Sequence, residues 1–176
     1  RIAGTATDNA SNTYNSYAFG YKATVGYDSV DGTTVTGANS AYAIGSEALA
    51  NGKYSYAIGY RAKAKAYGAI AIGSGIDVSN PYNTAIGSYN IAGLNASFAV
   101  GIGNDIDSRK NAITVLTNGN TGIGTAAPTN KLHVYASSDP VKLEGLQTGT
   151  STDQIVTVDS NGVLKKLTSS TLPNST

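Results

Sequence analysis

The chain has 176 residues and a formal net charge of +1, and only 13% of its residues are charged. Its lysines and arginines are mostly scattered, which argues against nucleic-acid binding, because that function needs a concentrated basic face. Cysteine is absent, so disulfides and thiolate metal sites are excluded. No apolar run approaches the length of a membrane span. The high glycine content, 21 residues, suits an exposed extracellular fibre.

A three-residue signature, Ala-Ile-Gly or a close variant, recurs through the first part of the chain. Five copies spaced 14 residues apart end at Gly45, Gly59, Gly73, Gly87 and Gly101. A sixth copy ends at Gly20, which is one period plus 11 residues ahead of the next. Self-similarity at a fixed period predicts stacked repeats. Fourteen residues are too few for a helical hairpin but suffice for two short strands and two tight turns, which make one coil of a narrow β-solenoid.

The second half of each repeat has the form Ala-x-Ala and shows which side chains line the coil. Side chains of a strand alternate between its two faces. Lys63 and Asp77 have the same parity and must face water, so Ala64 and Val78 point inward. Small residues line the interior because the two strands of so short a coil lie close together.

The first half of each repeat is apolar on both faces. Alanine occupies one face, and the other carries the expected self-association core, which is Ile44, Ile58, Ile72, Ile86 and Val100 with Tyr42 and Tyr56. Strands with two apolar faces are typical of sheets that are covered on both sides. One coil cannot cover both faces of its own strand, and an exposed stripe of this size is an interaction surface. The pattern therefore predicts self-association.

The 11 surplus residues between the first two signatures fall within residues 27–37. A coil must keep its register to stack, so we expect these residues to leave the roll as a loop. Insertions on one face of a repeat stack often form the binding surface. This favours receptor contact by Tyr27, Asp28 and Asp31, and the alternative is a loop that only closes the outer end of the roll.

The 14-residue register fails after Gly101, where polar residues 105–110 are expected to form a cap or handover. The sequence predicts a β-roll head at residues 1–110, a β-hairpin shaft or neck at 111–167 and a polar linker at 168–176. Asn161-Gly162 between two alternating segments predicts a hairpin. Strands are expected at residues 113–116, 121–124, 131–135, 141–146, 154–158 and 163–167.

The pattern x-Ala-Ile-Gly-x-x-Ala-x-Ala, carried by Gly20 and by Gly45 through Gly101, resembles the head repeats of YadA-like trimeric autotransporter adhesins. It covers roughly residues 15–101. The resemblance implies a left-handed parallel β-roll in each chain and a homotrimer whose rolls meet through their apolar faces. Tyr42 and Tyr56 depart from the small aliphatic residue that is usual in the family.

A second stretch, Gly-Asn-Thr-Gly-Ile-Gly-Thr-Ala-Ala-Pro-Thr-Asn-Lys-Leu-His-Val at residues 119–134, resembles a segment of phage tail fibres and large bacterial surface proteins. In those proteins the segment lies in a trimeric shaft. The resemblance therefore implies a β-rich trimeric shaft with hairpins and says nothing of an activity. Together the two stretches leave the source open between a bacterial adhesin and a fibre of a phage or phage-like injection system.

No pattern predicts catalysis, a cofactor or a metal site. His133 is the single histidine, so it has no second histidine or cysteine with which to hold zinc. Asp105 and Asp107 form the one close carboxylate pair, and a calcium loop needs more oxygen ligands. The sequence contains no nucleophile elbow Gly-x-Ser-x-Gly.

The tyrosines of the turns are ambiguous. They can stack on sugars or on a partner's side chains, or they can simply shield the edges of the coils. The candidates for receptor contact are Tyr54, Tyr60, Tyr82 and Tyr89.

The sequence therefore predicts an extracellular trimeric fibre protein without enzymatic activity. It would act as an adhesin or receptor-binding head through multivalent contacts. Its partners would be two further copies of itself and a host-cell surface, glycan or matrix receptor. It would be located on a bacterial cell surface or in a phage-like fibre. The alternative is a purely structural spacer of a phage, tailocin or surface fibre.

Overall fold

A computed structural model describes residues 15–26, 38–150 and 153–167, and these residues form strands, turns and loops without any helix. The all-β prediction is confirmed. No helix able to cross a membrane occurs in the described part of the chain. By internal contacts the chain divides into two compact units, residues 1–140 and residues 141–176.

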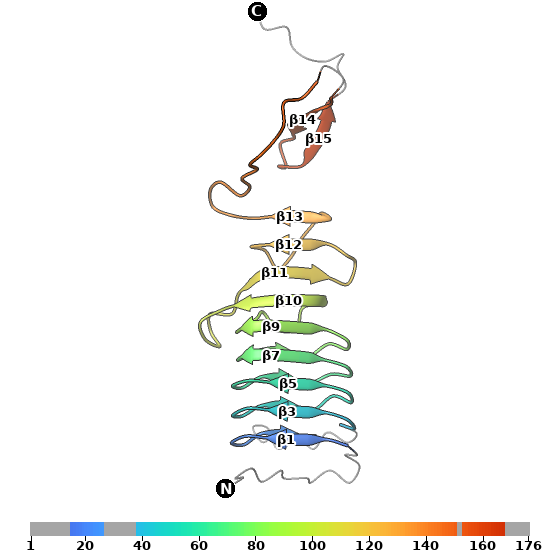
Figure 1. The fold of residues 1–176 in the computed structure, drawn as a ribbon, viewed down its shortest axis with the longest axis vertical. Coiled ribbons are helices and arrows are strands. Elements are labelled where there is room, and N and C mark those ends of the chain that lie inside the picture. The colour runs from blue at the N-terminus through green and yellow to red at the C-terminus, as the bar shows by residue number, and fades with distance from the viewer. Residues whose placement is uncertain (1–14, 27–37, 151–152, 168–176) are drawn as a thin grey trace, which may run out of the picture. The chain divides into compact units, whose positions relative to one another are not determined.

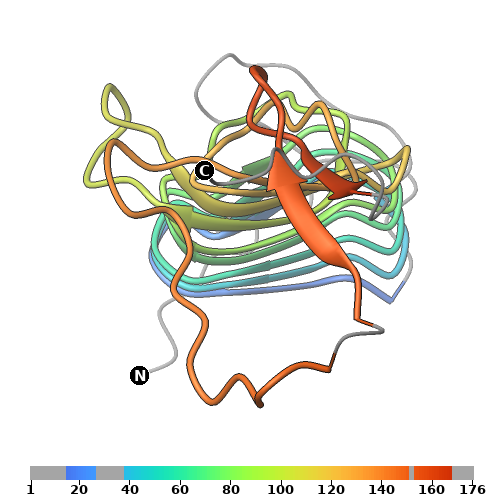
Figure 2. The same cartoon turned by 90° about the horizontal axis from the view of Figure 1, so that it is seen from above.

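The first unit is a parallel β-solenoid whose strands stack one above another (Figure 1). Each of the first four coils contributes one strand to each of two sheets, and Figure 2 views the coils end-on as flattened loops. The strands are β1 (Tyr17–Phe19), β2 (Thr24–Val25), β3 (Tyr42–Ile44), β4 (Leu49–Ala50), β5 (Tyr56–Ile58), β6 (Lys63–Ala64), β7 (Ile70–Ser74), β8 (Asp77–Val78), β9 (Thr84–Ser88) and β10 (Ala96–Ile102). The odd-numbered strands from β1 to β9 lead into β10 in the first sheet, and β2, β4, β6 and β8 form the second.

Neighbouring coils pair in parallel and in register, one repeat apart. Ala43 pairs with Ala57, and Ala57 with Ala71. The first coil keeps this register across the insertion, because β1 pairs with β3 and β2 with β4. The insertion at residues 27–37 itself lies outside the described residues.

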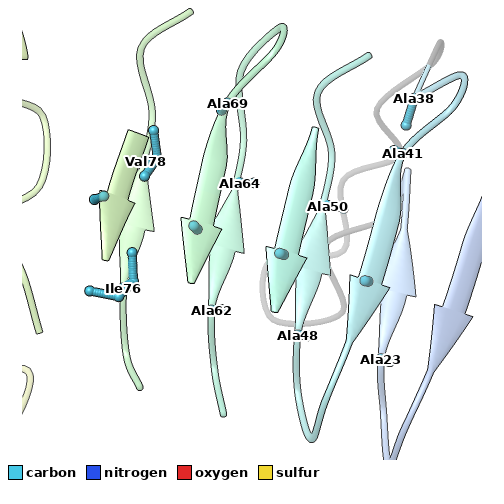
Figure 3. Close-up of a cluster of buried hydrophobic side chains, with 14 of the residues drawn as sticks. Ala23, Ala38, Ala41, Ala48, Ala50, Ala62, Ala64, Ala69, Ile76 and Val78 are labelled. Carbon is cyan, nitrogen blue, oxygen red and sulfur yellow. The ribbon is translucent and has the colours of Figure 1, made fainter. Parts of the chain in front are cut away.

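The interior of the coils is built from small side chains that meet between the two sheets (Figure 3). In the first sheet Ala57 and Ala71 are fully buried, and in the second sheet Ala64 is fully buried and Val78 is 4% exposed. Lys63 and Asp77 lie at the outward positions of the second sheet. The predicted alternation therefore holds for both halves of these coils, whereas in the first two coils the outward Thr24 and Leu49 are also buried, at 8% and 4% exposed.

The glycine that ends each signature is required both by its backbone and by its neighbour. Gly45 has φ of +127°, a conformation that L side chains rarely adopt, and a Cβ there would lie 2.3 Å from the carbonyl oxygen of Gly59. The same close approach recurs up the column, with a Cβ at Gly59 only 2.1 Å from the Gly73 carbonyl oxygen. Any side chain at these positions would force adjacent coils apart.

The first sheet does not end with the repeats. Strand β11 (Asn111–Leu116) pairs antiparallel with β10. It is followed by β12 (Thr121–Ile123), antiparallel to β11, and by β13 (Leu132–Val134), parallel to β12. The parallel pairing of successive coils thus ends with β10, where the 14-residue register fails, but the same sheet continues to residue 134.

The second unit contains a two-stranded hairpin of β14 (Ile155–Val158) and β15 (Leu164–Leu167). Asp159 Oδ1 accepts hydrogen bonds from the backbone N–H groups of Asn161 and Val163 in its turn. The hairpin predicted around Asn161-Gly162 is confirmed. The strand predicted at residues 141–146 is wrong: the segment pairs with no strand among the described residues, and Gly145 interrupts it with φ of +73°.

Candidate interaction surfaces

The outer face of the first sheet carries two columns of mostly apolar side chains, one residue from each strand. The strand register places the members of a column directly beside one another. The first column is Tyr17, Tyr42, Tyr56, Ile70, Thr84, Phe98, Val115, Thr121 and Leu132. The second column is Phe19, Ile44, Ile58, Ile72, Ile86, Val100, Ile113, Ile123 and Val134.

All seven residues expected in a self-association core lie in these columns. None of them is buried within one chain: Ile44 is 42% and Tyr56 is 41% exposed, Ile72 is also exposed, and the other four are half-buried. Alanines on the opposite face of the same strands are buried, so the two faces differ as the alternation predicts. Whether the columns form the core of a trimer stays a prediction.

Aromatic stacking organises the beginning of the first column. The rings of Tyr17 and Tyr42 lie 5.5 Å apart at an interplanar angle of 17°, and those of Tyr42 and Tyr56 lie 5.0 Å apart at 7°. Tyrosine replaces a small aliphatic residue here without disturbing the sheet, because identical rings one coil apart stack on each other. The stack also stiffens the exposed face.

The columns cross the point where the strand direction reverses. Val100 pairs with Ile113, Ile113 with Ile123, and Ile123 with Val134. Sequence reasoning assigned the last three residues to a separate shaft and missed that they extend the same surface. The available signal was the alternation of apolar residues after residue 111, but nothing in it shows which strand pairs with which.

The turn tyrosines fall into two groups. Tyr54 and Tyr82 lie on one side of the roll and are joined through Tyr67, whose ring contacts each of theirs edge-on, with centroids 5.5 and 5.2 Å away. Tyr67 was not among the expected contacts, although it lies one residue before the position that Gly68 holds between Tyr54 and Tyr82 in the 14-residue period. Tyr60 and Tyr89 lie at the other turn, the one that follows the signature. The structure therefore does not gather the four predicted tyrosines into one site.

The three residues expected in the insertion loop, Tyr27, Asp28 and Asp31, lie outside the described residues. Their assignment to receptor contact stays a prediction.

Ion pairs join successive coils beside the second sheet. Arg61 Nε donates to Glu47 Oε2 at 2.8 Å, and this hydrogen bond raises the pKa of Arg61 above its ordinary value. Lys65 Nζ donates to Asp77 Oδ2 at 2.8 Å. Both pairs neutralise a carboxylate on the roll surface.

His133 lies half-buried on β13, where its Nδ1 is 3.4 Å from the backbone nitrogen of Thr129. This contact gives the ring a local structural partner. A search of the described residues finds no cluster of three or more His, Cys, Asp or Glu side chains that could hold a metal ion.

Comparison with known proteins identifies part of the repeat region. A family model, the YadA head domain repeat, matches residues 50–75 in two copies. These residues include strands β5 and β6 and the signatures that end at Gly59 and Gly73. No curated protein matches the chain, and no solved structure matches it. The resemblance of the repeats to YadA-like heads is thus confirmed for these residues, whereas the resemblance of residues 119–134 to fibre shafts stays a prediction.

Proposed function

We propose that this chain is the head of a homotrimeric extracellular fibre on a bacterial surface, and that it acts as an adhesin. The two exposed apolar columns of the first sheet carry the proposal. A face of this kind, two residues wide and nine strands long, is larger than the scattered apolar residues that a monomer tolerates. The match of residues 50–75 to YadA head repeats supports a trimer as the assembly that covers it.

The energetics of the columns favour assembly. Fully burying one large apolar side chain contributes about 1.5–3 kcal/mol, so burying the part of each that one chain leaves exposed, less than half for most members, contributes at most about 1 kcal/mol. Two columns over nine strands in three chains contribute on the order of 50 kcal/mol as an upper bound. Joining bodies costs about 4–15 kcal/mol per association. The apolar gain exceeds the cost of bringing three chains together.

The function of such an assembly is non-covalent binding. A rigid trimeric stack holds three copies of the same surface at fixed positions, so weak contacts with a cell-surface receptor add through avidity. No catalytic step is part of the proposal. If the isolated trimer binds neither cells nor an array of glycans and matrix proteins, the head is a structural spacer that only sets the length of the fibre.

Light scattering of the purified protein tests the assembly. Wild type is expected as a trimer, and Ile58→Asp as a monomer, because three carboxylates would be buried without partners in the shared face. Lys53→Asp places a new carboxylate on a turn of the adjacent coil and should leave the trimer intact. A wild-type protein that stays monomeric at micromolar concentration would refute the proposal.

A further inference from the structure

A groove of about 520 Å³ runs along the second sheet, on the side away from the apolar columns. Five successive coils line it, from Lys22 in the first to Tyr89 in the fifth, together with outward residues of β2 to β8 such as Lys63. Among the described residues its other wall is the loop between β10 and β11, seen projecting from the stack in Figures 1 and 2. We call this feature the basic groove.

The loop that closes the groove is fixed in place. Arg109 Nη1 donates hydrogen bonds to the carbonyl oxygens of Gly75 at 3.1 Å and Asn90 at 2.9 Å, which ties the loop to two earlier coils. Asp105 Oδ1 accepts from the backbone N–H groups of Asp107 and Ser108. The polar segment expected to cap the roll therefore builds a wall beside it.

The groove has an excess of uncompensated positive charge. Two of its carboxylates are already neutralised, Glu47 by Arg61 and Asp77 by Lys65. Lys22 and Lys63 have no carboxylate partner among the described residues, and Arg109 is bonded to neutral carbonyls. Against these three cations stands the single carboxylate of Asp105. Cations gathered in one groove raise the local concentration of anions.

The dimensions of the groove fit one extended chain. Five coils separated by about 4.8 Å give a length of about 19 Å. The groove is therefore an elongated depression that crosses five coils. A linear oligomer fits such a depression better than a compact ligand does.

The lining indicates the chemistry of that oligomer. The exposed side chain of Ile106 and the ring of Tyr89 supply apolar surface. The charged groups of the lining are two lysines and two arginines with three carboxylates, Glu47, Asp77 and Asp105. The lysines can pair with sulfate or carboxylate groups, and the carboxylates can accept hydrogen bonds from hydroxyl groups. A sugar chain carries both kinds of group and an apolar ring face. An acidic peptide has no row of hydroxyl donors, and along most of the groove it finds no free strand edge, since β4 and β6 are paired on both sides.

We infer that the basic groove binds an acidic oligosaccharide, with Lys22 and Lys63 pairing its anionic groups. The inference deepens the proposed adhesive function and rests on it for its biological meaning. The groove lies on the sheet opposite the apolar columns, so it stays open when those columns are covered, and a trimer presents three copies. The turn tyrosines at 54, 67 and 82 are not needed for this contact.

Calorimetric titration of the intact protein tests the inference. The probe is a hexasaccharide of alternating sulfated glucosamine and uronic acid, compared with a neutral hexasaccharide of N-acetylglucosamine and with hexaglutamate. The sulfated probe should bind to each protomer, and raising the salt from 50 to 150 mM should weaken it, since exposed charges are screened. The neutral sugar and the peptide should bind at least tenfold more weakly.

Matched double variants locate the site. Lys22→Gln with Lys63→Gln should lower the affinity at least tenfold, whereas Lys53→Gln with Lys131→Gln removes the same charge from residues of the first unit that do not line the groove and should change it less than twofold. Circular dichroism melts verify that all variants fold. Equal loss in the two doubles, no binding by wild type, or equal binding of the neutral sugar would overturn the inference, and so would binding of hexaglutamate alone. Light scattering on the same samples keeps the outcomes separate: a trimer that ignores the sulfated probe refutes the groove and leaves the trimeric head standing.

Discussion

The glycine column should be the least substitutable part of the roll, and Gly59→Ala tests it. Gly59 has φ of +124°, and a Cβ built there lies 2.1 Å from the carbonyl oxygen of Gly73 in the next coil. Holding alanine at such a φ costs about 1–3 kcal/mol. Relieving the overlap moves the coils apart by about 1 Å and weakens at least two ladder hydrogen bonds, each worth about 0.5–1.5 kcal/mol. We expect a loss of about 2–6 kcal/mol in the free energy of unfolding.

Gly93→Ala is the matched control. Gly93 also has a positive φ, +72°, but a Cβ there meets nothing within 4 Å. It should therefore lose only the cost of the left-handed conformation, about 1–2 kcal/mol. Urea denaturation followed by circular dichroism, at equal protein concentrations because assembly contributes to stability, compares the two. If Gly59→Ala is no more destabilised than Gly93→Ala, coil-to-coil contact at the glycines does not govern the stability of the roll.

Two further predictions concern the region beyond the repeats. Ile123→Asp should weaken or abolish the trimer in light scattering, because the apolar columns continue through β12; an unchanged trimer would restrict the interface to the coils. In the β14–β15 hairpin, hydrogen bonding from the Val163 N–H lowers the pKa of Asp159 below its ordinary value of 3.8. The ionised carboxylate of Asp159 should therefore stabilise the hairpin fully above pH 3.8, and this stabilisation should be lost as the pH falls through the lower pKa of the folded state. NMR spectra recorded as the pH is lowered should show the hairpin losing stability in wild type but not in Asp159→Asn.

The sequence by itself determined the architecture of the coils. A strict 14-residue period forces equivalent residues to stack, so the parity of Ala57 against Ile58, and of Ala64 against Lys63, already separates the inside from the outside. The same period marks where glycine must permit a positive φ. These features are local and are repeated in each coil, and so they can be read without knowledge of the rest of the chain.

Only the tertiary structure decided what happens after the period ends. Strand β11 reverses direction and pairs with β10 through a shifted register between Val100 and Gly101, which no spacing in the sequence reveals. The sequence likewise does not reveal the contacts of Arg109. Its carbonyl partners lie 19 and 34 residues earlier in the chain, and these bonds anchor the loop that closes the basic groove. Residues 141–146 show the converse. Their apolar residues alternate, yet the segment is not a strand, because no strand among the described residues pairs with it. Alternation records which face of a segment is apolar, but pairing depends on which segments meet in space, and beyond the repeats nothing local specifies that.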